Sequence, residues 1–206
     1  MPHDDSAAME SHAETQPGTE EAGRVPVGEV ILDGDLARPS QVTGMALFAH
    51  GSGSSRHSPR NRRVADHLQR AGFGTLLLDL LTAEEERLDL HSRELRFDIG
   101  LLARRLLGTV DWLAARFGEG LPVGLFGAST GAAGALVAAA ERPDRVAAVV
   151  SRGGRPDLNR QAAGRLAVEH RLEVVPGAGH LFEEPGALEE VARLTAAWFS
   201  SHLRDD

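Results

Sequence analysis

The sequence predicts an α/β fold, a three-layer α/β/α sandwich with a mostly parallel sheet, and two observations lead to it. Short segments that are apolar throughout alternate along the chain with longer segments whose apolar residues recur at helical spacing. An uninterrupted apolar run is typical of a strand that is buried on both faces of a parallel sheet. The 206 residues suffice for one such domain with a substantial core, and nothing in them indicates a second.

Strands are expected wherever such a run is bounded by residues that favour turns. The turn-rich stretches 33–35 and 38–40 separate the first strand from the second, because Gly, Pro and Asp break regular structure. Thr-Leu-Leu-Leu at 75–78 is a clear example of a continuous apolar run. The expected strands cover residues 27–32, 45–49, 75–78, 123–126, 146–150 and 172–175.

Helices are expected in the intervals between these strands. Ser58-Pro59 opens one that Gly72 ends, since proline suits a first helical turn and glycine suits the end. In the longest one, Leu102, Leu106 and Val110 recur at helical spacing. The charged stretch 79–93 is interpreted as connecting structure. The expected helices cover residues 58–71, 95–117, 160–170 and 188–203, with an alanine-rich helix after Gly131.

Composition excludes several classes of chemistry. The chain has no Cys, no Tyr and no Lys, so all 22 of its basic residues are Arg. Disulfides, thiolate metal sites, Schiff-base chemistry and a phosphate-binding lysine are therefore excluded. A formal charge of −8 without a basic cluster argues against nucleic acid binding, and no His spacing indicates a metal site. We expect no cofactor and a small-molecule substrate, and the oligomeric state stays open.

The first 24 residues differ in composition from the rest. They hold acidic side chains but no branched aliphatic or aromatic residue, so they bury too little apolar surface to offset the entropy of ordering. We expect a disordered acidic tail over 1–24 and a folded domain over 25–206. No signal peptide or membrane-spanning segment is evident, which predicts a soluble cytoplasmic protein without membrane contact.

The stretch from Gly127 to Gly131 carries the strongest functional signal. The strand expected at 123–126 leads into Gly-Ala-Ser-Thr-Gly, and a helix follows. Strand, sharp turn and helix in this order are what a nucleophile elbow requires, so Ser129 is the candidate nucleophile. Three glycines at 127, 131 and 134 also suggest a dinucleotide-binding turn, but their spacing is not Gly-x-Gly-x-x-Gly.

Two loops at the ends of other expected strands complete a candidate acyl-transfer site. The glycine- and serine-rich loop 50–55 follows the strand at 45–49, and backbone N–H groups of Ser52 and Thr130 are the expected oxyanion hole. A phosphate-binding nest is the alternative interpretation of that loop. His180, on the loop after 172–175, is the candidate general base.

Four segments of the chain resemble the dienelactone hydrolase-like branch of the α/β-hydrolases. They are residues 47–61, 75–82, 127–133 and 149–158. The resemblance covers roughly 25–203 and implies hydrolysis of an ester-like bond with Ser129 as nucleophile, His180 as base, and Ser52 and Thr130 as oxyanion donors. Some members of this branch are fused to a phosphoribosyltransferase domain, which this chain lacks.

The chain departs from that pattern at the triad acid, which should lie between Ser129 and His180 on a loop after a further strand. No apolar run stands there, and about 25 residues of the family pattern are missing at Leu158-Asn159. Either the protein lacks this strand, or a segment is absent from the sequence as printed. Asp157 is the one candidate substitute, with a surface turn residue as the alternative. We expect His180 to have no well-placed carboxylate.

The sequence therefore predicts a serine hydrolase acting on a small ester, lactone or thioester, with activity impaired by the missing acid. The alternative is a hydrolase-derived domain that binds a small molecule or a partner without turnover. Arg56, Arg152 and Arg155 lie on expected loops and could pair with a substrate carboxylate, although solvated surface residues are the default interpretation.

Overall fold

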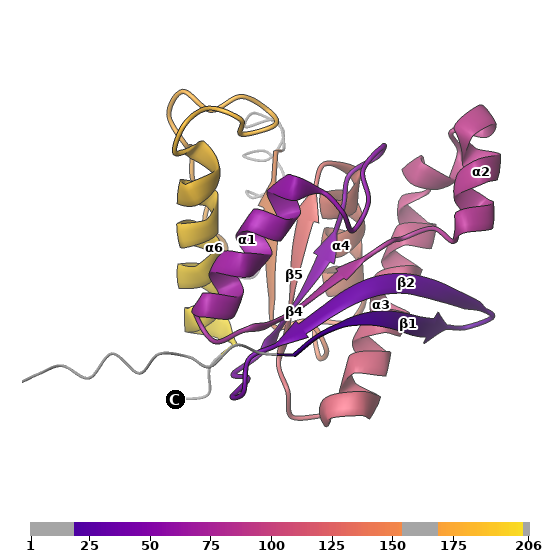
Figure 1. Ribbon diagram of the computed structural model, residues 1–206, viewed down its shortest axis with the longest axis horizontal. Coiled ribbons are helices and arrows are strands. Elements are labelled where there is room, and N and C mark those ends of the chain that lie inside the picture. Colours follow the sequence, from indigo (N-terminus) through magenta and orange to yellow (C-terminus); the bar gives the residue numbers. More distant parts are fainter. Residues whose placement is uncertain (1–18, 154–168, 204–206) are drawn as a thin grey trace, which may run out of the picture.

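The computed structural model describes residues 19–153 and 169–203, and a six-stranded sheet forms its centre (Figure 1). The strand order is β1-β2-β4-β3-β5-β6, in which β4, β3, β5 and β6 are parallel. The β1–β2 hairpin joins this core antiparallel to β4. The strands are β1 (Thr19–Val27), β2 (Val30–Arg38), β3 (Met45–Ala49), β4 (Gly74–Leu78), β5 (Val123–Ala128) and β6 (Ala148–Arg152).

Helices cover both faces of the sheet and form the predicted three layers (Figure 1). On one face α1 packs against α6, and on the other α3 packs against α4. The predicted α/β sandwich is thus confirmed. The helices are α1 (Pro59–Arg70), α2 (Ala83–Ser92), the 3₁₀ helix η1 (Leu95–Phe97), α3 (Ile99–Phe117), α4 (Thr130–Glu141) and α6 (Ala187–His202).

Two apolar cores lie between these layers. Leu106 and Val110 of α3 pack on the face that also buries Leu47 of β3, and all three are at most 1% exposed. On the opposite face Phe199 of α6 is fully buried in the cluster that includes Phe126 of β5. Because the four central strands are parallel, their carboxyl ends meet at one edge, where the candidate site residues also lie.

The N-terminal hairpin corrects two expectations. The strand expected at 27–32 is interrupted by a turn at residues 28 and 29, in which Gly28 has a φ of 59°, and residues 30–32 belong to β2. β1 begins at Thr19, so residues 19–24 form a strand rather than part of a disordered tail. Their order comes from backbone pairing with β2 and from ion pairs such as Glu21 with Arg116 at 2.7 Å, which apolar content does not reveal. Residues 1–18 lie outside the described part.

Local signals explain the boundaries of the helices. The Ser58 hydroxyl accepts the N–H of Asn61 at the start of α1, and Asp98 accepts the N–H of Leu101 at the start of α3. Within the stretch expected to be a connection, Thr82 and Glu85 form a capping box that opens α2. The long helix accordingly begins at 99 rather than 95, after the separate turn of η1.

The expectation of a strand at 172–175 is wrong. These residues belong to no strand, and Leu172 and Val174 are 38% and 59% exposed. In the described ranges β6 is the edge strand and pairs with β5 alone, so residues 172–175 have no further strand beside them to pair with. The strand expected at 146–150 runs from Ala148 to Arg152. The helix expected at 160–170 falls almost entirely outside the described residues.

No helix in the described part of the chain is both long and apolar enough to cross a membrane.

Candidate active site

Ser129 occupies a strained turn between β5 and α4. Its φ of 52° and ψ of −117° lie outside the regions that L residues normally adopt, and its side chain is exposed. Strain of this kind costs about 1–3 kcal/mol and clusters at functional sites. The Ser129 N–H donates to the carbonyl of Arg152 at 3.2 Å, which fixes the turn to the neighbouring strand β6. The elbow that the sequence predicts is therefore present in the structure.

The two flanking glycines are required by close packing. A Cβ at Gly127 would lie 2.4 Å from the Cα of Ala132, and one at Gly131 would lie 2.3 Å from the carbonyl oxygen of Ala49. Both distances are shorter than any real Cβ contact, and both partners are backbone atoms. Larger residues at these positions would push α4 away from the end of β5.

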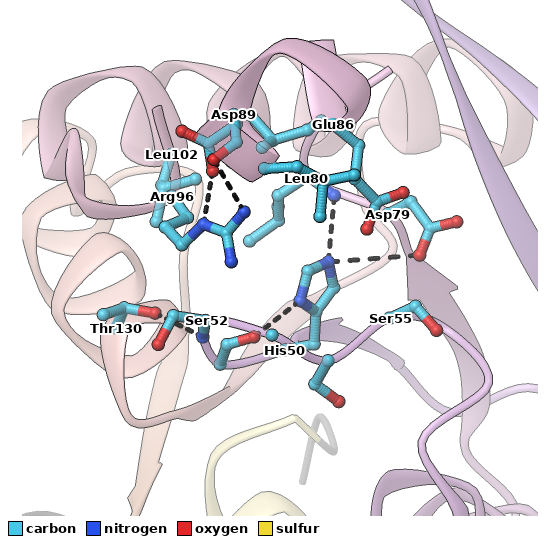
Figure 2. Close-up of a pocket in the computed structure, with 15 residues that line it drawn as sticks. His50, Ser52, Ser55, Asp79, Leu80, Glu86, Asp89, Arg96, Leu102 and Thr130 are labelled. Carbon is cyan, nitrogen blue, oxygen red and sulfur yellow. Dashed lines mark hydrogen bonds and ion pairs between the residues drawn. The ribbon is translucent and has the colours of Figure 1, made fainter. Parts of the chain in front are cut away.

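The predicted oxyanion loop lies next to the first turn of α4 (Figure 2). The backbone N–H of Ser52 donates to the side-chain oxygen of Thr130 at 2.9 Å. The Thr130 N–H is one of the first-turn groups that have no acceptor within their own helix. The structure thus brings both predicted donors to one place. The Ser52 N–H, however, is bonded to a side chain in this state.

His50 anchors the loop to the end of β4. Its Nε2 accepts the N–H of Leu80 at 3.2 Å, and its Nδ1 lies 3.0 Å from the carbonyl oxygen of Gly51 (Figure 2). A neutral ring protonated at Nδ1 satisfies both bonds, because an acceptor must face the N–H and a donor must face the carbonyl. His50 is therefore part of the scaffold of the loop.

Arg56 is bound within the protein and is not free for a substrate. Its backbone N–H donates to the Asp79 carboxylate at 2.6 Å, and its guanidinium forms an ion pair with the same carboxylate. Its Nε lies 3.4 Å from the carboxylate of Asp35. Burial lowers the pKa of Arg56, but the hydrogen bond and the charge of Asp79 outweigh this effect and raise it above the ordinary value. Arg56 does lie on a loop as expected, but its guanidinium is paired with Asp79 rather than solvated.

His180 lies beside the end of β6. A Cβ on Gly153 would be 3.4 Å from its Cε1 and 3.5 Å from its Nδ1, so the imidazole contacts the residue that follows Arg152. Its side chain is exposed. Since the Arg152 carbonyl accepts the Ser129 N–H, the candidate nucleophile and the candidate base both lie at the carboxyl end of β6. In the described part of the chain, the side chains of Ser129 and His180 are not hydrogen-bonded to each other.

Within the described ranges, no carboxylate oxygen lies within 4.0 Å of a His180 ring nitrogen. Glu183 pairs with Arg60 at 2.7 Å, and Glu184 accepts the N–H of Gly179 at 2.9 Å. Asp157, Arg155 and the Leu158-Asn159 junction lie outside the described residues. The role of Asp157 as triad acid therefore stays a prediction.

A cavity of about 290 Å³ opens between the oxyanion loop and the α2–η1 segment. Leu80, Leu102 and Thr130 line it together with charged side chains of that segment (Figure 2). Thr130, the residue after Ser129, borders this cavity, whereas Ser129 and His180 are not among its lining residues.

The α2–η1 wall of this cavity was missed by the sequence interpretation, which read residues 79–93 as a connection. Asp89 is fully buried, pairs with Arg96 and accepts the N–H of Leu95 at 2.7 Å. Burial opposes ionisation of Asp89, but these donors outweigh it and hold its pKa below the ordinary value. The Thr82–Glu85 capping box was the sequence signal that could have located α2.

No group of three or more potential metal ligands occurs in the part of the chain that the structure describes.

Comparison with known proteins places this fold and site in a family. A family model described as alpha/beta hydrolase fold matches residues 47–196, well over half of the sequence. The chain therefore belongs to the α/β-hydrolase fold family, and its class is that of a hydrolase. The crystal structure of dienelactone hydrolase from Anabaena variabilis matches with a TM-score of 0.88 at 53% identity, over 91% of this chain and 100% of that one. The chain is accordingly of the dienelactone hydrolase-like type.

A more distant structure shares the fold alone. Est1E from Butyrivibrio proteoclasticus matches at 14% identity with a TM-score of 0.65, over 90% of this chain and 98% of that one.

Two longer relatives come from Mycobacterium tuberculosis. They are the putative phosphoribosyl transferases MT0597 and Rv0571c, each 49% identical over 214 residues. The match covers 91% of this chain but 47% of each relative, so the chain spans about half their length. The matched region is longer than the 206 residues of this chain, so the relatives hold residues there that this chain lacks.

Proposed function

We propose that the protein is a serine hydrolase that cleaves a small ester, lactone or thioester through an acyl-enzyme on Ser129. The observation that carries this proposal is the strained backbone of Ser129, which is maintained by glycine contacts and by the hydrogen bond to Arg152. A strained, exposed serine at a strand-to-helix turn presents its hydroxyl to a substrate. The dienelactone hydrolase of Anabaena variabilis, at 53% identity, supports the same reaction class.

In the proposed reaction His180 takes the proton from Ser129 Oγ while the oxygen attacks the substrate carbonyl. The N–H groups of Ser52 and Thr130 donate hydrogen bonds to the oxygen that gains the negative charge, and the Ser52 N–H is shared between this oxygen and the Thr130 hydroxyl that orients it. The C–O or C–S bond then breaks, and His180 returns the proton to the leaving alcohol or thiol. Water, activated by His180, hydrolyses the acyl-enzyme and restores Ser129.

Hydrolysis of p-nitrophenyl acetate by the wild type and by Ser129→Ala tests this proposal. We expect the variant to lose activity by at least about a hundredfold, because removal of the nucleophile leaves only oxyanion stabilisation and binding. Ser201→Ala, an exposed serine on α6, is the matched control and should retain full activity. Equal rates for the wild type and Ser129→Ala would reject serine catalysis.

One observation favours a second candidate function, namely ligand binding without turnover. The described residues place no carboxylate within 4.0 Å of a His180 ring nitrogen, and loss of a triad acid lowers turnover about 10⁴-fold in serine proteases. The same assay separates the two functions. A binding domain would show no Ser129-dependent hydrolysis, whereas an impaired hydrolase would show slow hydrolysis that Ser129→Ala abolishes.

A further inference from the structure

Arg152, the last residue of β6, is buried and not a solvated loop residue as the sequence suggested. The residue is 8% exposed. Arg152 lies opposite Ala128 in the β5–β6 ladder, directly beside the Ser129 turn. A buried guanidinium at this position requires a structural or functional reason, because desolvating a cation is costly.

The guanidinium of Arg152 contacts the loop that carries His180. Its Nη1 donates to the carbonyl of Leu181 at 3.4 Å, and its Cζ lies 5.7 Å from the centre of the Phe182 ring. Phe182 itself has a positive φ of 56°, so this loop adopts a strained turn that needs support. The guanidinium of Arg152 therefore contacts both Leu181 and Phe182, the two residues that follow His180.

Arg152 has no charge partner in the described part of the chain. Burial and the nearby cation of Arg60 lower the pKa of Arg152 to about 10, and its Nε has no hydrogen-bond partner among the residues that the structure describes. Salt bridging within the described ranges thus does not account for the position of this side chain. Among the described residues, the guanidinium of Arg152 makes its contacts with the His180 loop.

The backbone of Arg152 contacts the other half of the candidate site. Its carbonyl accepts the Ser129 N–H at 3.2 Å, and the adjacent Gly153 packs against the His180 carbonyl and ring. A Cβ on Gly153 would lie 3.0 Å from the His180 carbonyl oxygen. One short segment therefore contacts both the turn of the candidate nucleophile and the loop of the candidate base.

We propose that Arg152 is a positioning residue for His180. Its carbonyl fixes β6 to the Ser129 turn, and its guanidinium holds the His180 loop at that same strand end. This support matters because residues 172–175, which lead into the loop, are not part of the sheet. The catalytic part of the inference rests on the proposed function, whereas the structural part does not.

Hydrogen exchange tests the structural part without requiring activity. In Arg152→Met, which keeps the apolar stem but removes the guanidinium, amides of the peptide covering 176–186 should exchange at least about fivefold faster than in the wild type. Arg142→Met is the matched control, since Arg142 is a partly exposed arginine that pairs with Asp144 before the start of β6, and it should leave this peptide unchanged. Equal exchange in Arg152→Met and the wild type would overturn the inference.

A double-mutant cycle tests whether Arg152 acts through His180. We expect Arg152→Met to lower kcat for p-nitrophenyl acetate about tenfold to a hundredfold with less than a threefold change in KM, as for a misplaced catalytic group. In a His180→Ala background the same substitution should cause no further loss. Losses that multiply would assign Arg152 a general structural role and contradict the proposal. If circular dichroism shows that Arg152→Met does not fold, Arg152→Lys enters both measurements with the same criteria.

The two proposals fail in different ways. Equal hydrolysis by the wild type and Ser129→Ala would reject serine catalysis, while faster exchange of 176–186 in Arg152→Met would still support the role of Arg152 in holding the loop. Ser129-dependent hydrolysis with unchanged exchange would reject Arg152 alone.

Discussion

At the scale of single residues, the candidate site depends on backbone contacts that leave no room for side chains. Ser129 adopts a φ of 52° because the chain must turn from β5 directly into α4. Gly131 lies against the carbonyl oxygens of Ala49 and His50, so the same contact joins α4 to the start of the oxyanion loop. Small residues here determine the geometry of both the candidate nucleophile and the predicted oxyanion donors.

We predict that Gly131→Ala destabilises the protein and removes its activity. The new Cβ would lie 2.3 Å from the Ala49 carbonyl oxygen, and overpacking of this kind costs about 1–3 kcal/mol or more in the free energy of unfolding. Gly120→Ala is the matched control, because a Cβ there would contact nothing within 4 Å. Urea unfolding of both variants checks the prediction, which fails if their midpoints agree.

Thr130→Val tests the bond between the side chain of Thr130 and the Ser52 N–H. Valine keeps the branched shape but cannot accept this hydrogen bond, so the oxyanion loop loses a contact that orients its N–H. We expect kcat/KM for p-nitrophenyl acetate to fall about tenfold, since misplaced donors stabilise the transition state less well. Thr130→Ser retains the hydroxyl and should restore most of the activity. Wild-type kinetics in Thr130→Val would show that the bond has no functional role.

At the scale of elements, one buried ion pair organises the wall of the cavity. Asp89 joins the end of α2 to η1 through Arg96 and the Leu95 N–H, while Leu88, Leu90 and Phe97 of the same segment stay more than half exposed. Apolar burial therefore contributes little to holding this segment. Polar contacts hold it instead, namely those of Asp89 and the ion pair of Glu85 with Arg105 of α3 at 2.6 Å.

The stability that Asp89 contributes should depend on pH. Because its pKa in the folded protein lies below the ordinary 3.8, its contribution is fully present above that value and is lost as the pH falls through the folded pKa. We expect Asp89→Asn to be less stable than the wild type at pH 7, with the difference shrinking at about pH 3. Guanidinium unfolding at both pH values measures this, with Asp66→Asn, the same change at an exposed position of α1, as control. A difference that stays constant with pH would contradict the account.

At the scale of the whole molecule, the sheet ends at β6 in the described residues. Since Leu172 is 38% exposed whereas Leu106 is fully buried, the two leucines should respond differently to truncation. We predict that Leu106→Ala lowers the free energy of unfolding by about 2–5 kcal/mol. Leu172→Ala should change it by less than about 0.5 kcal/mol. A large loss for Leu172→Ala would mean that residues 172–175 pack as a buried strand after all.

The sequence predicted those parts of the molecule whose order follows from apolar periodicity and turn chemistry. The elbow at Ser129 and the helix from Pro59 are examples, because strong local signals coincide there with buried positions. The strand β1 was missed, since pairing of its backbone rather than its side chains holds it in place. The burial of Arg152 also depends on packing between segments distant in sequence, which periodicity cannot reveal.

The proposed reaction requires Ser129 to be an activated nucleophile. The most direct measurement is incubation of the protein with a fluorophosphonate, followed by mass spectrometry of the intact chain and of the peptide that contains Ser129. We expect one phosphonyl group per chain, located on Ser129, and no adduct in Ser129→Ala. Absence of an adduct on Ser129, or equal labelling of the wild type and Ser129→Ala, would contradict the account.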